Sequence, residues 1–361
     1  MSYLRNTWYV AAWDNEIETG TVLARKLLDV PVVLFRNEDG VVHALLDRCP
    51  HRFVPLSKGR LCGSSIQCAY HGLEFDGTGN CTKNPHGDGL IPKAAKVKSF
   101  QVMEQHSLIW IWMGEPEKAD TSMIPDFSKS LDPEKRYVGK DYLLAKANYQ
   151  LEIDNILDLS HVEFLHGTTL GSDAVKHAET CVVQEGNTVY SNRLMRNEIV
   201  THSLASTYGI PAGVPVDRWM DVRWEAPAQM ELWSGWAPAG ADNPREVGKK
   251  IPFVHIFTPE TEATTHYWFG TSYPMKMGEE GKRRAERDVA YLRVPFENED
   301  LPMLEVQQEA MRNSSFWSLK PVLLPSDGPA VRARRVLDAM IKAEQSHSNQ
   351  PPVPTEQGDQ A

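Results

Sequence analysis

The chain has 361 residues, 41% of them hydrophobic and 24% charged, a composition typical of a globular protein with two domains. Its formal net charge of −10 argues against binding to nucleic acid or to an anionic membrane surface. There is no apolar run of about 18 residues and no apolar export signal at the start, so we expect a cytoplasmic protein with no membrane span. Five cysteines in so long a chain argue for reduced thiols and metal ligands rather than a disulfide framework.

Residues 1–115 predict an all-β domain. Short runs rich in β-branched and aromatic residues are separated by turn signals at 37–40 and 75–80. Two metal-ligand motifs fall on loops at the ends of such runs, where a rigid sheet can hold them. The predicted strands are residues 31–36, 41–46, 65–70, 97–103 and 108–113.

The most informative stretch joins a C-x-H motif at Cys49 and His51 to a C-x-x-H motif at Cys68 and His71, with sixteen residues between them. Two thiolates and two imidazoles at these offsets can close around metal. A tetrahedral zinc site would take one Cys and one His from each motif. A Rieske [2Fe–2S] centre would place both thiolates on one iron and both imidazoles on the other. The single residue inside the first motif is unusual for zinc and favours the Rieske centre.

The composition changes after residue 115. Residues 116–136 are charged and contain three prolines, which predicts a linker. Residues 137–345 then predict a second domain of strands and helices, and the polar tail 346–361 predicts disorder. In the second domain we expect strands around 186–195, 219–236 and 252–270, the last a hairpin turning at 258–261, and helices around 147–166, 279–312 with a break at Pro295, and 329–345.

The segment around Asp158 holds a second group of polar side chains. Asn155, Asp158 and His161 recur every three residues and drift slowly along one face of a helix. His166 lies about 140° from His161 around a regular helix, so the two can share a metal only where the helix ends or distorts. Gly167 predicts such an end. Two histidines on a half-buried helix, with Asp158 as a hydrogen-bond partner, remain a simpler interpretation.

A 2-His-1-carboxylate site suits non-haem Fe(II) and needs a carboxylate far downstream. The candidate is Asp300, at the start of a predicted helix with Pro302 in its first turn. On position alone, a role as the cap of that helix is the simpler interpretation of Asp300.

Together these motifs resemble a known family. CPHR, CAYHG, DNILDLSHVEFLH and the late ED-x4-E-x-Q-Q pattern are similar to those of the Rieske non-haem iron oxygenases. RNTWYVAAW and IFTPETEATTHYWFG are similar to the aromatic O-demethylase branch, which includes the vanillate and dicamba monooxygenases. The resemblance covers most of the chain. It implies an α+β protein: an N-terminal all-β Rieske domain, then a catalytic domain in which an antiparallel sheet and helices carry a mononuclear iron.

The resemblance also implies the ligands. They are Cys49 and Cys68 on one cluster iron, His51 and His71 on the other, and His161, His166 and Asp300 on the catalytic Fe(II). Asp158 resembles the aspartate that connects a Rieske histidine of one subunit to an iron-ligand histidine of the next, and Asn155 would line the same end of the site. We therefore expect a head-to-tail homotrimer.

The implied activity is that of the terminal oxygenase component of a monooxygenase acting on a small aromatic substrate with O2. With a methoxylated aromatic acid, hydroxylation of the methoxy carbon gives a hemiacetal that collapses to a phenol and formaldehyde, a demethylase step of aromatic catabolism. No G-x-G-x-x-G motif follows a predicted strand, so electrons from NAD(P)H would come through a separate reductase or ferredoxin. Hydroxylation of an aryl methyl group or of the ring is an alternative, as is a Rieske electron-transfer protein without oxygenase activity.

The substrate pocket is expected to be an apolar cleft with a few polar groups. Candidates for its wall are Leu232, Trp233, His255, Trp268 and Tyr291. His255 is similar to a substrate-facing histidine of the dicamba-type relatives. Leu232 stands where those relatives have an asparagine, which argues against a copied carboxylate clamp.

Overall fold

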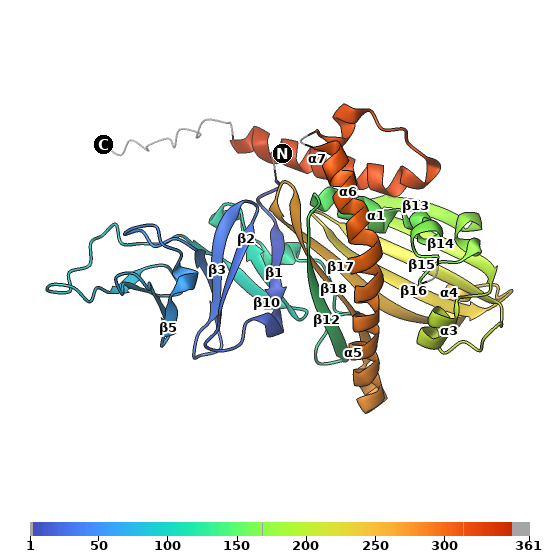
Figure 1. The fold of residues 1–361 in the computed structure, drawn as a ribbon, viewed down its shortest axis with the longest axis horizontal. Coiled ribbons are helices and arrows are strands. Elements are labelled where there is room, and N and C mark those ends of the chain that lie inside the picture. The colour runs from blue at the N-terminus through green and yellow to red at the C-terminus, as the bar shows by residue number, and fades with distance from the viewer. Residues whose placement is uncertain (1–2, 168, 313, 349–361) are drawn as a thin grey trace, which may run out of the picture.

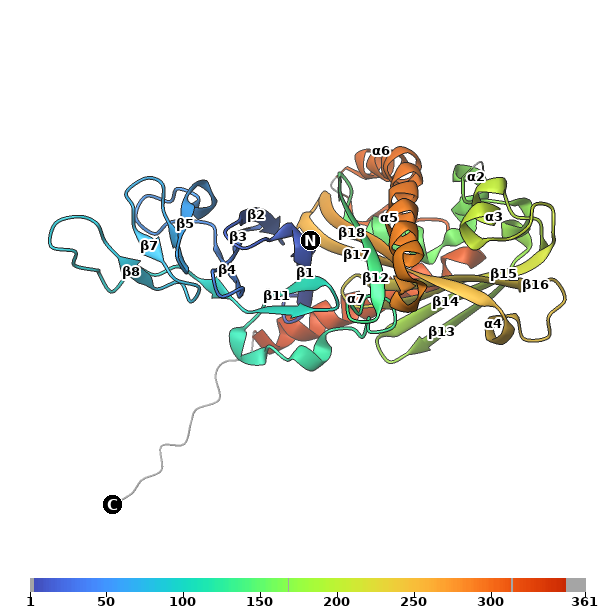
Figure 2. The ribbon, with the colours of Figure 1, turned by 90° about the horizontal axis from the view of Figure 1, so that it is seen from below.

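The computed structural model describes residues 3–348 except residues 168 and 313. The chain forms an elongated molecule with a small β-rich body at one end and a larger body around a broad sheet at the other (Figures 1 and 2). Among the described residues, no helix has the length and apolar character needed to cross a membrane.

The first body consists of three small antiparallel sheets, in the orders β1-β11-β10, β2-β3-β4-β9 and β5-β6-β7-β8. The predicted hairpin at 31–36 and 41–46 is confirmed as β3 and β4, whereas the run 97–103 divides into β9 and β10. The strands are β1 (Trp8–Trp13), β2 (Val22–Leu27), β3 (Val30–Arg36), β4 (Val42–Leu46), β5 (Arg60–Cys62), β6 (Ser65–Gln67), β7 (Glu74–Phe75), β8 (Cys81–Lys83), β9 (Ser99–Phe100), β10 (Val102–Gln105) and β11 (Leu108–Trp112).

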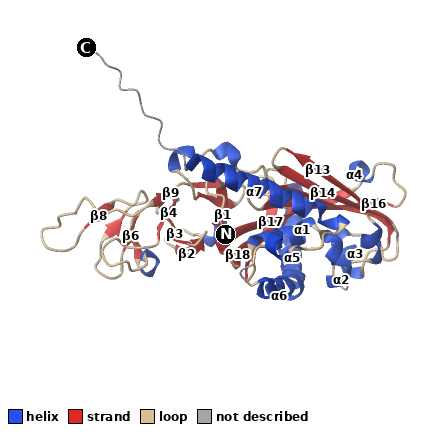
Figure 3. Cartoon of the chain, turned by 90° about the horizontal axis from the view of Figure 1, so that it is seen from above, coloured by secondary structure: helices blue, strands red, loops and turns tan. Residues whose placement is uncertain are grey.

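The second body is a seven-stranded antiparallel sheet with helices, in the order β12-β18-β17-β16-β15-β14-β13. Its strands are β12 (Arg136–Ala145), β13 (Glu179–Glu185), β14 (Thr188–Glu198), β15 (Val216–Glu225), β16 (Gln229–Pro238), β17 (Lys249–Thr261) and β18 (Thr264–Pro274). The helices are α1 (Tyr149–Leu157), α2 (Val162–Leu165), α3 (His202–Tyr208), α4 (Pro244–Val247), α5 (Gly278–Pro295), α6 (Leu301–Met311) and α7 (Gly328–Ser348). Helices α2, α3 and α6 lie on one side of the sheet in Figures 2 and 3.

The two faces of this sheet have different partners, because side chains alternate along each strand. On β18, Tyr267 and Phe269 point into the core beneath the helices. Trp268, between them, packs with Trp8 and Trp110 from the sheet β1-β11-β10, and its indole N–H donates to Glu16 at 2.8 Å. A cluster rich in tryptophan therefore joins the two bodies through the face opposite the helices.

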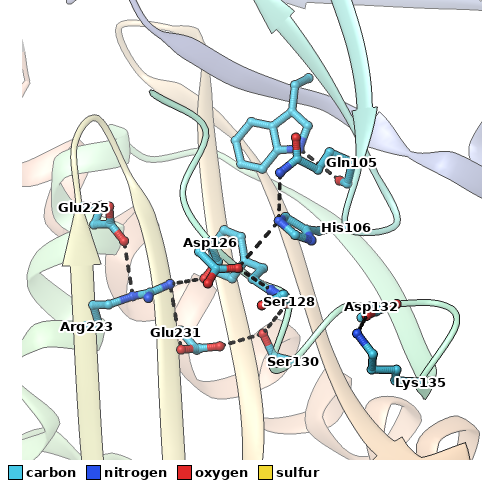
Figure 4. A network of polar contacts seen from close by, with 12 residues as sticks. Gln105, His106, Asp126, Ser128, Ser130, Asp132, Lys135, Arg223, Glu225 and Glu231 are labelled. Carbon is cyan, nitrogen blue, oxygen red and sulfur yellow. Dashed lines mark hydrogen bonds and ion pairs between the residues drawn. The ribbon is translucent and has the colours of Figure 1, made fainter. Parts of the chain in front are cut away.

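The predicted linker is held firmly against both bodies. Ser130 donates to the carboxylate of Glu231 at 2.6 Å, and Arg223 donates to the carbonyl of Asp126 at 2.7 Å (Figure 4). The Asp126 carboxylate lies 3.9 Å from His106 in the turn between β10 and β11. This network fixes how the first body sits on the sheet.

Several sequence expectations need correction. The expected helix 147–166 stops at Leu157, because Asp158 takes a non-helical conformation and caps a following 3-10 turn. The hairpin turns at residues 262–263 rather than 258–261, because Thr258 is buried and donates to the carbonyl of Val10. The single run 219–236 is two strands, β15 and β16. The expected break at Pro295 is confirmed.

The C-terminal helix extends to Ser348, so residues 346–348 of the expected tail are helical. The rest of that tail, 349–361, lies outside the described residues.

Candidate metal centres and substrate cavity

The break at Asp158 turns His161 towards His166. After α1 ends, residues Leu159–His161 form a 3-10 turn in which the Asp158 carboxylate accepts the N–H of Ser160 at 3.0 Å. Helix α2 then carries the chain to His166, and the two imidazole rings lie with their centroids 5.2 Å apart. The distortion that a shared metal requires therefore lies just before His161, not between the two histidines.

Asp300 completes this group from the other end of the sequence. A π-helical turn, Phe296–Asp300, follows Pro295 and places the buried Asp300 carboxylate 3.1 Å from Nε2 of His166 and 3.5 Å from Nε2 of His161. The carboxylate makes no capping hydrogen bond to α6. The three ligand atoms lie within 4.8 Å of one another, and two imidazoles with one carboxylate leave open positions, which suits non-haem Fe(II).

Outer partners orient each ligand. Nδ1 of His161 donates to the carbonyl oxygen of Asp158 at 2.7 Å, and Nδ1 of His166 lies 2.5 Å from Glu299. Both Nε2 atoms therefore face Asp300 with a lone pair available, the tautomer a metal needs. Asn155 donates to Asp300 at 3.0 Å, so Asn155 touches a ligand rather than the metal.

Sequence reasoning missed Glu299, although it directly precedes Asp300. The hydroxyl of Thr169 also donates to Glu299, at 2.9 Å. The signal was the acidic pair itself, in which one carboxylate can bind metal while its neighbour orients a ligand.

The two cysteine loops share one backbone pattern. In each loop the cysteine N–H donates to the carbonyl five residues on, and its own carbonyl accepts from the N–H four residues on, at 2.8–3.0 Å for Cys49 and Cys68. The tight turn needs a positive φ at the fourth residue after the cysteine. Gly72 supplies it with a φ of 74°, and Phe53 adopts a φ of 62°. The same hydrogen-bonded loop is thus formed twice, once after Cys49 and once after Cys68.

The donors of these loops divide into a buried pair and a surface pair. Cys49 and Cys68 are buried, whereas the rings of His51 and His71 lie at the surface with centroids 4.4 Å apart. In the part of the chain that the structure describes, no three of these four donors lie within 4.8 Å of one another, as a tetrahedral zinc ion would require. Paired thiolates and paired imidazoles on two irons fit the arrangement. Burial raises the pKa of the Cys49 thiol to about 11 without metal.

A largely apolar cavity of about 100 Å³ adjoins His161, His166 and Asp300. A cavity of about 150 Å³ is known to hold benzene, so this smaller space has room for no more than a single ring and excludes a polycyclic molecule. Its wall includes Asn155, Leu204, Met220, Phe253 and Phe296.

The expected pocket residues divide into two groups. His255, Leu232 and Tyr291 line the cavity. Trp233 does not, because it points to the opposite face of the sheet, where Lys250 lies 4.5 Å from its ring centroid. Trp268 belongs to the cluster between the bodies. Both tryptophans occupy strand positions of the wrong parity to reach the cavity.

His255 presents a fixed donor to the cavity. Burial lowers the pKa of His255 to about 4, so the ring is neutral near pH 7. Tyr267 lies 2.7 Å from its Nδ1 and keeps its proton, because burial raises the pKa of that phenol. Tyr267 therefore donates to Nδ1, and the N–H at Nε2 of His255 remains for a ligand.

Comparison with known proteins agrees with both metal centres. Residues 7–107 match the Rieske [2Fe-2S] domain, and residues 145–343 match the vanillate O-demethylase oxygenase C-terminal domain. The chain belongs to the Rieske non-haem iron oxygenases. It is an oxygenase component that carries a Rieske [2Fe–2S] cluster and a mononuclear iron.

Members of this oxygenase family match along almost the whole chain. The dicamba O-demethylase oxygenase component of Stenotrophomonas maltophilia is 39% identical over 348 residues, which cover 95% of this chain and 99% of that protein. A vanillate O-demethylase oxygenase subunit of a Pseudomonas species is 32% identical, covering 94% and 96%. The crystal structure of dicamba monooxygenase bound to dicamba superposes with a TM-score of 0.84 at 36% identity, covering 96% and 100%. The expected α+β fold is thereby confirmed.

Proposed function

We propose that this oxygenase demethylates a methoxylated aromatic acid. The observation that carries the proposal is the single-ring cavity that opens directly onto the ligand set of His161, His166 and Asp300. Relatives that match end to end are named for O-demethylation of dicamba and of vanillate, which supports the same class of substrate. In this reaction a methoxyarene, O2, NAD(P)H and a proton give a phenol, formaldehyde, water and NAD(P)+.

The bound ferrous ion supplies activation of O2. The chain itself places the substrate and excludes water: Leu232 and Phe296 form apolar wall, and His255 offers the N–H at Nε2 to an oxygen of the substrate. Tyr291 lines the wall near Thr169, whose carbonyl its hydroxyl approaches at 3.4 Å. These side chains orient the substrate so that its methoxy carbon faces the iron ligands.

Electron supply is part of the proposal. NAD(P)H acts indirectly, through a separate reductase or ferredoxin. The cluster loops and α2 lie at opposite ends of one chain (Figure 2), which supports electron transfer between subunits of a head-to-tail homotrimer. Asp158 then connects the partner's cluster to His161. Apolar side chains beside each centre are exposed as such docking requires: Phe53 and Tyr70 at 69% and 61%, and Phe164 on α2 at 82%.

None of the five cysteines, all of which lie among the described residues, forms a disulfide, which supports the cytoplasm as the compartment.

The direct test is formaldehyde and phenol release across a panel of methoxybenzoates, with purified protein, a surrogate reductase and NADH. We expect one formaldehyde for each O2 consumed with the best substrate. Benzyl alcohols from methylbenzoates would show the methyl-hydroxylation alternative instead. Iron content separates a pure electron carrier, with about two atoms per chain, from this oxygenase, with about three.

A further inference from the structure

A buried arginine lines the cavity on the wall formed by β15. Arg218 is 2% exposed and shares this wall with Met220, its neighbour two positions along the strand. Met220 pairs in register with Ser234 on β16, and Tyr208 of α3 closes the same region. These residues bring polar groups to a cavity that is otherwise mainly apolar.

Glu198 holds one edge of the Arg218 guanidinium. Nε and Nη2 donate to the two oxygens of Glu198 at 2.7 and 2.9 Å, and Ser172 also donates to that carboxylate. Nη1 donates to the thioether of Met220 at 3.6 Å, a weak acceptor, and the guanidinium also hydrogen-bonds to the Tyr208 hydroxyl. The five N–H donors therefore have three good acceptors, the two oxygens of Glu198 and the Tyr208 hydroxyl. The edge beside Met220 lies at the cavity wall.

The Tyr208 hydroxyl also accepts a hydrogen bond from Arg218 and so helps to hold the guanidinium. Its hydroxyl bonds to Ser234, whose hydroxyl donates to the carbonyl of Trp219 at 3.3 Å. Tyr208 thus donates to Ser234 and accepts from Arg218, which preorganises the guanidinium beside the cavity. A preorganised donor of this kind loses little freedom when a ligand binds.

Charge decides which ligand fits best. Arg218 is balanced by Glu198, and the cavity-lining Asp288 is balanced by Arg287 at 2.7 Å. Asp300 and the neighbouring Glu299, which contacts His166 and accepts from Thr169, carry two negative charges that a ferrous ion would offset. Arg218 is the only arginine or lysine among the described residues that line the cavity, so an anionic group of a substrate would find its charge-assisted donor there.

We infer that Arg218 determines substrate specificity by binding the carboxylate of the substrate through the guanidinium edge that Glu198 leaves free. This inference rests on the proposed function and deepens it, because it names the residue that binds the acid group of the substrate. Glu198 and Ser172 are positioning residues that hold the guanidinium and do not touch the substrate.

The test compares binding of 4-methoxybenzoate and 4-methoxybenzamide, which have nearly the same shape and differ in charge. Calorimetric titration of the iron-loaded protein without oxygen measures binding without turnover. We expect the acid to bind about 10- to 100-fold tighter, the usual range for a charge-assisted hydrogen bond. Equal binding of the two probes would overturn the inference.

Two variants locate the effect. Arg218→Gln combined with Glu198→Gln removes both charges, so no buried ion is left unpaired, and should abolish the preference for the acid. Glu198→Gln alone leaves the cation unbalanced and should strengthen that preference. Arg245→Gln, which breaks a half-exposed pair with Asp221, is the control and should leave it unchanged. A preference that survives in the double variant would assign the acid to another residue.

The outcome is separable from that of the proposed function. Formaldehyde from both the acid and the amide, without a binding preference, would remove the role of Arg218 and leave O-demethylation standing. Charge-selective binding that depends on Arg218 but yields no formaldehyde from any methoxyarene would support the role of Arg218 and contradict O-demethylation.

Discussion

Nδ1 of His166 lies 2.5 Å from Oε2 of Glu299, while Nε2 of the same ring faces Asp300 at 3.1 Å. One imidazole is thus held by two carboxylates from adjacent residues. Such a contact fixes the tautomer and raises the basicity of a ligand histidine.

Glu299→Ala should therefore weaken iron binding by about 10- to 100-fold, the usual effect of losing an outer partner of a ligand. Titration of the apoprotein with Fe(II) under nitrogen measures the affinity, and the visible spectrum should show an unchanged Rieske cluster. Glu297→Ala is the control, because that exposed carboxylate pairs only with Arg293 on the surface in the described structure. Equal losses in the two variants would mean that Glu299 has no special role.

Asp158→Asn should retain both metals but slow the passage of electrons between them by about 10- to 100-fold. The main-chain carbonyl that holds His161 is unaffected by this substitution, so the iron site keeps its geometry. Stopped-flow oxidation of the prereduced cluster, with substrate and O2, measures the step. Asp173→Asn, at a side chain 96% exposed, should behave as the parent. Unchanged cluster oxidation in Asp158→Asn would exclude the proposed bridge.

His266 should make the junction between the two bodies sensitive to acid. Nε2 donates to the carbonyl of Lys26 on β2, and Nδ1 accepts from Tyr142, whose pKa burial raises to about 12. Burial, with a smaller contribution from Arg25, lowers the pKa of His266 to about 4, while the hydrogen bond to Lys26 and the charge of Glu260 oppose this shift. The unfolded chain takes up the proton first, so stability is full above pH 6.5 and falls towards pH 4, by about 3 kcal/mol at most.

Urea unfolding between pH 7 and pH 4 tests this expectation. His266→Gln keeps an amide donor and acceptor but cannot titrate, so its stability should fall less with acid than that of the parent. His177→Gln, at an exposed position, controls for a general effect of removing a histidine. Parallel pH profiles for parent and His266→Gln would refute the assignment.

Ser130→Ala should destabilise the fold by about 1–3 kcal/mol, because it leaves a buried oxygen of Glu231 without its donor. Ser128→Ala, two residues away and half-buried, should cost much less, because the carboxylate that Ser128 contacts, Asp126, is exposed. Chemical denaturation compares the free energies of unfolding. A loss in Ser130→Ala no larger than that in Ser128→Ala would show that the bond of Ser130 to Glu231 does not stabilise the fold.

The sequence predicted those parts of the fold that hydrophobic periodicity or a metal-ligand motif indicates. The hairpin β3–β4, the break at Pro295 and the approach of Asp300 to His161 and His166 all followed from residue patterns and family resemblance. Strand β13 was missed, because its residues are mostly polar and exposed at the edge of the sheet. The end of α1 was misplaced, because a local capping interaction of Asp158 overrides helical propensity.

The pocket was harder to predict than the metal sites. Trp233 was chosen by residue type, but strand parity turns its side chain away from the cavity. Arg218 was overlooked, because a lone arginine in a strand carries no motif. Its place beside the cavity depends on the pairing of β15 with β16 and on the approach of α3, neither of which a linear pattern reveals.

The π-helical turn Phe296–Asp300 also limits how this scaffold can be redesigned. Deleting or inserting one residue there would rotate Glu299 and Asp300 by about 100°, so neither carboxylate would meet His166. The segment 209–215, between α3 and β15, is mostly exposed and carries no such constraint. Efforts to enlarge the cavity for bulkier pollutants should therefore vary loop length at 209–215 and preserve the length of the chain from Pro295 to Leu301.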